Sequence, residues 1–277
     1  MALKKRLDLL LVERGMATGR DKAKALIMQG AVYVNGEKAQ KPGEEYSPEL
    51  EIEVRAKPFP YVSRGGLKLE KAVKVFDIPM QGAVCADIGA STGGFTHCLL
   101  EHGAAKVYAV DVGYGQLAWE LRKDERVVVL ERTNARYLTK EQIPEPLRLI
   151  TIDVSFISLT LLLPGLSKLL EQDGRVLCLI KPQFEAGRDK VGKNGVVRDP
   201  AVHLQVIEKV VDHAKTIGLD PIGLDFSPIK GPKGNIEYLL YLGKNREELS
   251  FERGAFRAVV QTALEELEEK HESSDLT

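Results

Sequence analysis

Between residues 83 and 217 the chain alternates short apolar runs with stretches of helical spacing. The apolar runs include AVCADIG, AKVYAVDVG, VVVLER, LRLITIDVS and GRVLCLIKP, each of a length suited to one strand. Strands this apolar are normally covered on both faces, and the intervening helices can supply that cover. The alternation therefore predicts an α/β domain with a mostly parallel, doubly wound sheet.

Two further strands are expected after this region. GLDFSPIK and IEYLLYLG are separated by the turn residues GPKGN, so they predict an antiparallel hairpin at the edge of the same sheet. From about residue 249 the sequence has the pattern of a charged amphipathic helix.

The N-terminal region has a different pattern. Leucines at helical spacing predict one helix over residues 6–15, and a second is expected over residues 19–30. Val32-Tyr33-Val34 then leads into Asn35-Gly36, a strong signal for a tight hairpin. Two helices followed by a small sheet predict a small α+β domain.

A proline-broken stretch, Lys57-Pro58-Phe59-Pro60, separates the two patterns. We therefore predict a small domain over residues 1–60 and a larger one over residues 61–277. Gly65 and Gly66 follow the break, and we expect them to form a flexible connection that leads into the first helix of the larger domain.

The net charge of −1 means that any affinity for nucleic acid must come from local patches. Residues 1–30 contain seven Lys or Arg against three acids, which fits either a solvated helix face or an RNA-binding surface. The segment RLDLLLVERGMATGRDKAKALIMQGAVYVNGE resembles the S4 RNA-binding module. In that module the basic second helix and the turn before it lie against folded RNA. The resemblance implies RNA contacts by Lys5, Arg6, Arg20, Lys22 and Lys24.

A glycine-rich turn follows the first apolar strand. In DIGASTGGF, Asp87 to Phe95, glycines allow close approach of the backbone to a ligand, although they could also serve only to tighten the turn. The second strand ends at Asp111, whose carboxylate can accept bonds from both hydroxyls of a ribose. Turn and acid together suggest an adenosine-type cofactor.

This segment resembles motif I of the S-adenosylmethionine-dependent methyltransferases, which have a Rossmann-like fold. The resemblance implies S-adenosyl-L-methionine as the cofactor and identifies Asp111 with the acid that binds its ribose. The cofactor contacts that it implies are Asp87, Gly89, Ser91, Gly93, Gly94, Phe95, Asp111, Asn134 and Asp153.

The fourth strand ends in ITIDVSF, a position that divides methyltransferases by substrate. Enzymes that methylate an exocyclic amine usually carry Asn/Asp-Pro-Pro-aromatic here, and this chain does not. Enzymes that methylate a pyrimidine carbon usually need a cysteine after a proline, and none of the three cysteines follows one. The sequence therefore argues against both classes.

Lys68, Asp153, Lys181 and Glu237 occur in this order, the last three on core strands. The set resembles the catalytic tetrad of the FtsJ/RrmJ-type ribose 2′-O-methyltransferases. A 2′-hydroxyl is too weak an acid to ionise near pH 7, so it needs a base or a strong orienting partner. We expect mutual repulsion between the two lysines to lower the pKa of one amine, with the carboxylates limiting that shift. We expect no metal.

The order of S4 module and FtsJ-like domain resembles the TlyA family of ribosomal RNA cytidine 2′-O-methyltransferases, also known as hemolysins. The resemblance implies ribosomal RNA or ribosomal subunits as partners. It extends through KPQFEAGRDKVGKNGVVRDP, which we interpret as a mobile flap or a plain surface loop. Arg64, Arg188 and Lys190 are further candidates for RNA contact.

Two alternatives belong to other classes. An RNA-binding assembly factor with an inactive methyltransferase domain would still bind the cofactor. A membrane-active hemolysin would need a signal peptide or a spanning segment, but the longest apolar run, Leu159 to Leu163, is stopped by Pro164. Three widely spaced cysteines suggest a reducing compartment, so we expect a cytoplasmic enzyme.

Overall fold

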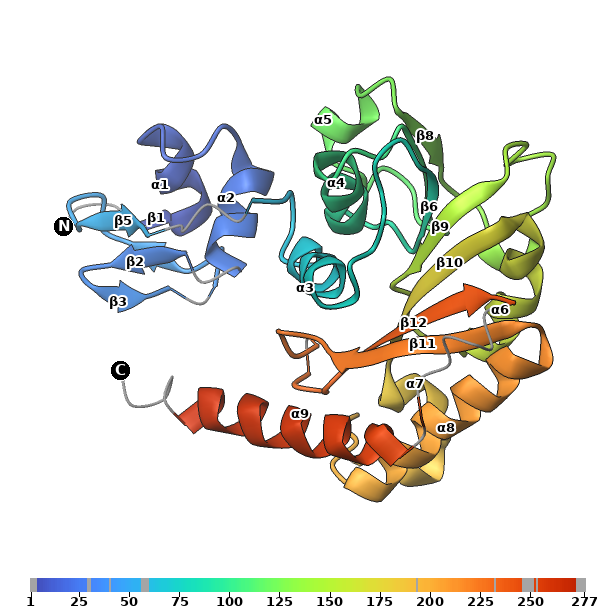
Figure 1. Cartoon of the computed structure of the whole chain (residues 1–277). Coiled ribbons are helices and arrows are strands. Elements are labelled where there is room, and N and C mark those ends of the chain that lie inside the picture. The colour runs from blue at the N-terminus through green and yellow to red at the C-terminus, as the bar shows by residue number, and fades with distance from the viewer. Residues whose placement is uncertain are drawn as a thin grey trace. The chain divides into compact units, whose positions relative to one another are not determined.

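The structure is a computed structural model (Figure 1) that describes residues 4–28, 31–39, 41–55, 60–192, 194–231, 233–245, 252 and 254–272. The chain divides into two compact units, Met1–Pro60 and Tyr61–Thr277. Among the described residues no helix combines the length and apolar character needed to cross a membrane.

The N-terminal unit has the two predicted helices, α1 (Leu7–Glu13) and α2 (Arg20–Met28). Its remaining elements are β1 (Lys5–Arg6), β2 (Val32–Val34), β3 (Glu37–Lys38), β4 (Glu45–Tyr46) and β5 (Ile52–Val54). The strands form an antiparallel sheet of order β3-β2-β5 and a separate β1-β4 pair. Asn35 and Gly36 have φ values of 50° and 84°, as a two-residue hairpin turn requires, so the predicted hairpin is confirmed.

The larger unit is built on a seven-stranded sheet of order β11-β12-β10-β9-β6-β7-β8. Its strands are β6 (Val84–Ile88), β7 (Lys106–Val110), β8 (Val127–Leu130), β9 (Leu147–Ile152), β10 (Leu170–Ile180), β11 (Leu219–Phe226) and β12 (Tyr238–Lys244). The ladders between β8, β7, β6, β9 and β10 are all parallel, which confirms the predicted α/β architecture. β12 pairs with β10 on one side and β11 on the other, both antiparallel, so β12 lies inside the sheet and β11 forms the edge.

Helices cover both faces of this sheet (Figure 1). On one face lie α3 (Gly66–Phe76), α4 (Gly94–Glu101) and α5 (Trp119–Arg122). On the other lie α6 (Leu159–Leu166), α8 (Pro200–Thr216) and α9 (Gly254–Glu272). Apolar side chains alternate between the two resulting layers along each strand, which is the burial expected of a doubly wound sheet.

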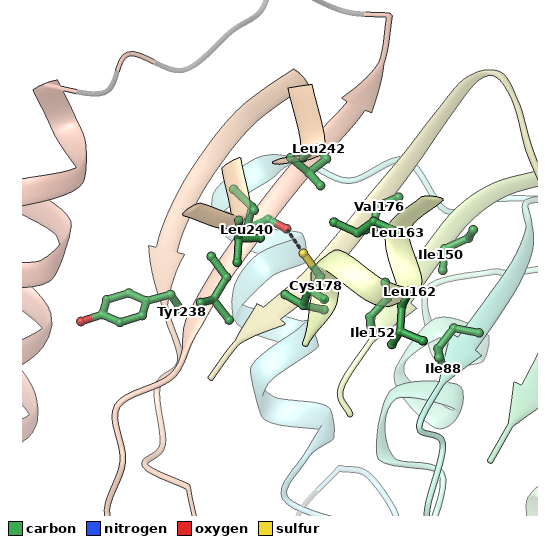
Figure 2. Packing of buried hydrophobic residues seen from close by; sticks show 14 of the residues in the cluster. Ile88, Ile150, Ile152, Leu162, Leu163, Val176, Cys178, Tyr238, Leu240 and Leu242 are labelled. Carbon is green, nitrogen blue, oxygen red and sulfur yellow. Dashed lines mark hydrogen bonds between the residues drawn. The ribbon is translucent and has the colours of Figure 1, made fainter. Parts of the chain in front are cut away.

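Figure 2 shows the second layer around Cys178. Leu162 and Leu163 of α6 pack there against Ile150 and Ile152 of β9. The Cys178 thiol is fully buried and donates weakly to the Leu240 carbonyl oxygen at 3.7 Å. Cys85 and Cys98 are also buried and free, so all three cysteines are core residues.

Candidate active site

Four ionisable side chains meet beyond the carboxyl ends of β9 and β10. Asp153 directly follows β9, Lys181 directly follows β10, and Glu237 directly precedes β12. Because Ile180 pairs with Tyr238, the beginning of the antiparallel strand β12 lies beside the end of β10. Lys68, in the first turn of α3, completes the set.

The four side chains form a continuous series of ion pairs. Lys68 Nζ lies 2.7 Å from Glu237 Oε2 and 3.2 Å from Asp153 Oδ2. Lys181 Nζ lies 2.5 Å from Asp153 Oδ1 and 3.5 Å from the Ser155 hydroxyl oxygen. Cations and anions alternate, so the fully ionised cluster carries no net charge. Its side chains are largely buried, from 1% exposed for Glu237 to 18% for Asp153.

Burial and charge pairing shift the pKa values of Lys68 and Asp153 in opposite directions. Burial disfavours the charged amine of Lys68, but Asp153 and Glu237 raise its pKa above the ordinary value. Burial likewise disfavours the charged carboxylate of Asp153, but Lys68 and Lys181 lower its pKa below the usual range. The expectation that repulsion between lysines would lower an amine pKa is therefore wrong for Lys68, because carboxylates lie between the amines.

The glycine-rich turn lies directly against the end of β9. Gly89 has a φ of 83°, and a Cβ at this position would lie 2.5 Å from the carbonyl oxygen of Asp153. Only glycine therefore allows the turn to pass this close to the ion-pair cluster. Ser91 also has a positive φ, 49°, and its N–H donates to Asp111 Oδ2 at 2.8 Å.

Asp111 and Asn134 lie at the ends of the next two strands. Asp111 follows β7, is partly exposed, and also accepts a bond from the Gly113 N–H at 2.7 Å. Asn134 lies beyond β8, is exposed, and accepts a bond from the Arg136 N–H at 3.0 Å. Gly89, Ser91, Asp111, Asn134 and Asp153 are thus the expected cofactor residues that remain partly or fully accessible.

Asp87, in contrast, lies beneath the turn. It has no exposed surface, and its Oδ2 accepts bonds from the Thr96 N–H and hydroxyl at 2.9 and 2.7 Å. Its Oδ1 accepts a bond from the Thr151 hydroxyl at 3.1 Å. Burial raises the pKa of Asp87 to about 7 despite these bonds. This carboxylate therefore joins β6, α4 and β9 beneath the turn, and its expected part in cofactor binding stays a prediction.

Gly93, Gly94 and Phe95 lie deeper in the fold than Gly89 and Ser91. All three are buried, and Phe95 belongs to the core between α3, α4 and the sheet. A side chain on Gly93 would collide with Leu121, and one on Gly94 would lie 2.9 Å from the Gly66 nitrogen. The small size of the two glycines therefore permits close packing, and the expected cofactor contacts of all three residues stay predictions.

The same packing fixes the beginning of α3. Gly66 meets Gly94, and any side chain on Gly66 would collide with the Tyr61 ring. Gly65 has helical φ and ψ values of −54° and −38°. The expected flexible connection is therefore wrong, because these glycines let α3 approach α4 closely enough to bring Lys68 to the cluster.

Phe156, which follows Asp153 by three residues, was not among the expected site residues. Its side chain is 90% exposed, and its backbone φ of 66° is unusual for a bulky residue. The ring lies 4.9 Å from that of Phe184, and both rings line a groove that also includes Arg188 and Lys233. The sequence shows an aromatic residue after a strand end, but neither its exposure nor its strained backbone could be read from the sequence.

The segment after Lys181 is attached to the core at its far end. Val197 is buried; its N–H donates to the Asn235 side chain at 3.0 Å, and its carbonyl oxygen lies 3.0 Å from His203 Nε2. Arg188 is exposed at the groove, and Lys190 donates to Gln205 at 2.8 Å. The stretch interpreted as a flap or surface loop is therefore fixed at Val197 by its bonds to Asn235 and His203.

The expected RNA contacts of the N-terminal unit lie on its surface. Arg6 and Arg20 both bind the buried carboxylate of Asp8. The other three basic residues are Lys5, paired with Glu13 at 2.8 Å, Lys24, paired with Asp21 at 3.3 Å, and Lys22, which is exposed. Arg64, in the larger unit, is exposed as well.

Comparisons with known proteins bear on both units. The family model for FtsJ-like methyltransferases matches residues 61–244, and the model for the S4 domain matches residues 5–52. The 16S/23S rRNA (cytidine-2′-O)-methyltransferase TlyA of Mycobacterium tuberculosis is 45% identical over 260 residues, which are 94% of this chain and 97% of TlyA. Hemolysin A of Brachyspira hyodysenteriae is 44% identical over 237 residues, which are 85% and 98% of the two chains.

A solved structure of a hemolysin-like protein from Streptococcus thermophilus covers 98% of this chain and 100% of its own, with 44% identity and a TM-score of 0.79. The similarity therefore extends through both units. It confirms the resemblances to the S4 module and the FtsJ-like domain that were drawn from the sequence.

Proposed function

The chain belongs to the FtsJ-like methyltransferase family and, with its S4 domain, to the TlyA group, and we propose that it methylates the ribose 2′-hydroxyl of a cytidine in ribosomal RNA with S-adenosylmethionine. The observation that carries this proposal is the ion-pair series Glu237-Lys68-Asp153-Lys181 next to the Gly89 turn. Such a series orients an amine for a weakly acidic hydroxyl.

The accessible residues of the turn fit an adenosine-type cofactor. Gly89 leaves the backbone open, Asp111 offers carboxylate oxygens to ribose hydroxyls, and Asn134 is assigned to the adenine. When bound, S-adenosylmethionine supplies a methyl group that its sulfonium charge already activates. The protein therefore has mainly to align the ribose oxygen with that methyl group and to remove one proton.

We assign the proton transfer to Lys181. In its neutral form the Lys181 amine can accept the hydroxyl proton, and Asp153 at 2.5 Å stabilises the ammonium group that results. Lys68 and Glu237 hold Asp153 in place from the other side. Because the pKa of Lys68 is raised, we assign Lys68 the role of a fixed cation rather than that of the base.

We assign RNA binding to two surfaces. The basic residues of the S4 domain contact phosphates without reading sequence. At the active site, the exposed ring of Phe156 offers a face for stacking an unpaired base, and Arg188 and Lys233 lie along the same groove.

Mass mapping of ribose methylation on ribosomal RNA, from cells with and without the gene, tests this function. We expect at least one 2′-O-methylcytidine to disappear without the gene and to return with the wild-type gene but not with Lys181→Ala. Identical maps in both strains would contradict the proposal. Binding of S-adenosylmethionine without any transfer to ribosomal RNA would instead support an assembly factor.

A further inference from the structure

Among the described residues of the N-terminal unit, one carboxylate is completely buried. Asp8, the second residue of α1, has no exposed surface. Arg6 Nε donates to its Oδ1 at 3.0 Å, and Arg6 Nη2 donates to its Oδ2 at 2.9 Å. Arg20, the first residue of α2, donates from Nη2 to the same Oδ2 at 3.2 Å. One acid therefore binds two guanidinium groups from separate segments of the chain.

The bonds from Arg6 keep this buried acid ionised. They lower the pKa of Asp8 to about 2, burial opposes that shift, and Arg20 adds to it. A buried carboxylate of this kind is costly unless its oxygens are paired, so Asp8 requires its bonds to Arg6 and Arg20.

Both arginines nevertheless remain available for a ligand. Their side chains are 43% exposed for Arg6 and 51% exposed for Arg20. A guanidinium group has five N–H donors, and the bonds to Asp8 use two donors of Arg6 and one of Arg20. Two nitrogens that contact one oxygen at 2.9 and 3.2 Å lie no more than about 6 Å apart. The remaining donors thus belong to two cationic groups that one carboxylate holds close together.

A turn of the backbone restricts Arg6 further. A Cβ on Gly43 would lie 3.3 Å from Arg6 Nη1, so the glycine backbone packs closely against the guanidinium group. The same turn accepts the Asp8 N–H at the Pro42 carbonyl oxygen and the Leu7 N–H at the Glu44 carbonyl oxygen, at 3.1 and 2.9 Å. Arg6 is therefore held by the carboxylate and by this turn together.

We propose that Asp8 is a positioning residue for RNA binding, which holds Arg6 and Arg20 as a paired fork for the phosphate backbone of folded RNA. The inference rests on the proposed function and names the geometry by which the S4 domain would hold its substrate. Planar guanidinium groups bind phosphate through two parallel N–H bonds, so the orientation of the group matters as well as its charge.

If only the charge of Asp8 mattered, its removal would have the opposite effect on RNA affinity. A carboxylate among cationic residues weakens attraction to phosphate, so removing its charge should tighten RNA binding. Positioning predicts weaker binding, because both forks lose the partner that fixes their direction. The sign of the change in affinity therefore distinguishes the two roles.

Asp8→Asn in the full chain, compared with Asp21→Asn, tests the inference. Asp21 is also in the N-terminal unit, but its side chain is fully exposed and pairs with Lys24. Each variant removes one negative charge. Filter binding to purified 16S and 23S ribosomal RNA over a range of salt concentrations should show about tenfold weaker binding for Asp8→Asn and a flatter salt dependence. Asp21→Asn should bind as tightly as the wild type or more tightly. Affinity of Asp8→Asn equal to or above that of Asp21→Asn would overturn the inference.

Arg6→Lys keeps the charge and removes the fork, so it carries the test if Asp8→Asn fails to fold by circular dichroism. We expect several-fold weaker binding for Arg6→Lys, and wild-type affinity would overturn the inference. Methyl transfer is measured separately on the same RNA. Asp8→Asn should raise the KM for RNA and leave kcat unchanged, whereas a lowered kcat at saturating RNA would contradict a positioning role. A wild-type protein that binds RNA without methylating it would contradict the proposed function but not this inference.

Discussion

Lys68 Nζ and Glu237 Oε2 lie 2.7 Å apart although 169 positions separate the two residues. Lys68 is on the helix before the first strand of the larger unit, and Glu237 precedes its last strand. The pair therefore forms only when both ends of the α/β unit are in place, so the active site depends on the completed sheet.

Glu237→Ala should destabilise the larger unit. Lys68 would remain buried with one carboxylate fewer, and breaking a buried pair from one side typically costs about 3–5 kcal/mol. Chemical denaturation measures this loss. Lys74→Ala is the matched control, because Lys74 forms an exposed pair with Glu70 and its loss should cost less than about 1 kcal/mol. Equal losses for the two variants would show that burial of the Lys68 pair has no such consequence.

Lys181→Ala should abolish methyl transfer and leave cofactor binding intact. The amine contacts Asp153 and Ser155 rather than the Gly89 turn, and loss of a general base commonly reduces kcat by about 10²–10⁴-fold. Single-turnover transfer and calorimetric titration with S-adenosylmethionine separate these effects. Lys168→Ala changes an exposed lysine and should retain full activity. Transfer at the wild-type rate by Lys181→Ala would remove Lys181 from the mechanism.

Asp87 should make stability depend on pH between about 4 and 7. Its folded-state pKa of about 7 lies above the ordinary value of 3.8, so the folded state binds the proton more tightly than the unfolded state does. Stability should therefore fall as pH rises through this window and level off above it. In Asp87→Asn, thermal unfolding at a series of pH values should lack this part of the dependence. A pH profile unchanged by the substitution would show that another group is responsible.

Gly94→Ala should displace α3 from α4 and thereby disturb Lys68. The added Cβ would lie 2.9 Å from the Gly66 nitrogen, and overpacking of this kind costs about 1–3 kcal/mol. We expect a lower unfolding temperature and reduced transfer. Gly254→Ala should show neither effect, because the new Cβ would lie within 4 Å of no described residue beyond its chain neighbours and the backbone of its own helix. An active and stable Gly94→Ala protein would contradict the requirement for close helix packing.

Phe156→Gly should gain stability and lose function. The side chain is 90% exposed, so its removal loses little buried apolar surface. A φ of 66° costs a phenylalanine of order 1–3 kcal/mol, and glycine adopts this φ without that cost. Loss of the ring should raise the KM for RNA and leave S-adenosylmethionine affinity unchanged. Phe156→Tyr keeps a stacking face and should stay near wild type. An unchanged KM in Phe156→Gly would exclude base stacking at this position.

The candidate site could be predicted wherever the sequence marks the end of a strand. Asp111, Asp153 and Lys181 each follow an apolar run, and a parallel sheet brings such ends to one edge. The direction of the Lys68 pKa shift could not be predicted, because it depends on carboxylates lying between the two amines. The burial of Asp87 was also missed, because its partners Thr96 and Thr151 come from α4 and β9.

The sequence by itself determined the elements of this protein. Apolar periodicity specified the strands and helices, and Asn35-Gly36 specified a hairpin. The resemblance of four side chains to a known catalytic tetrad implied the reaction class. Only the tertiary structure decided which of the candidate residues are accessible and which are buried. Gly93 and Gly94 pack against neighbouring elements, and Phe156 lies exposed on a strained backbone. These properties arise from contacts between residues far apart in the chain, and local sequence patterns do not encode such contacts.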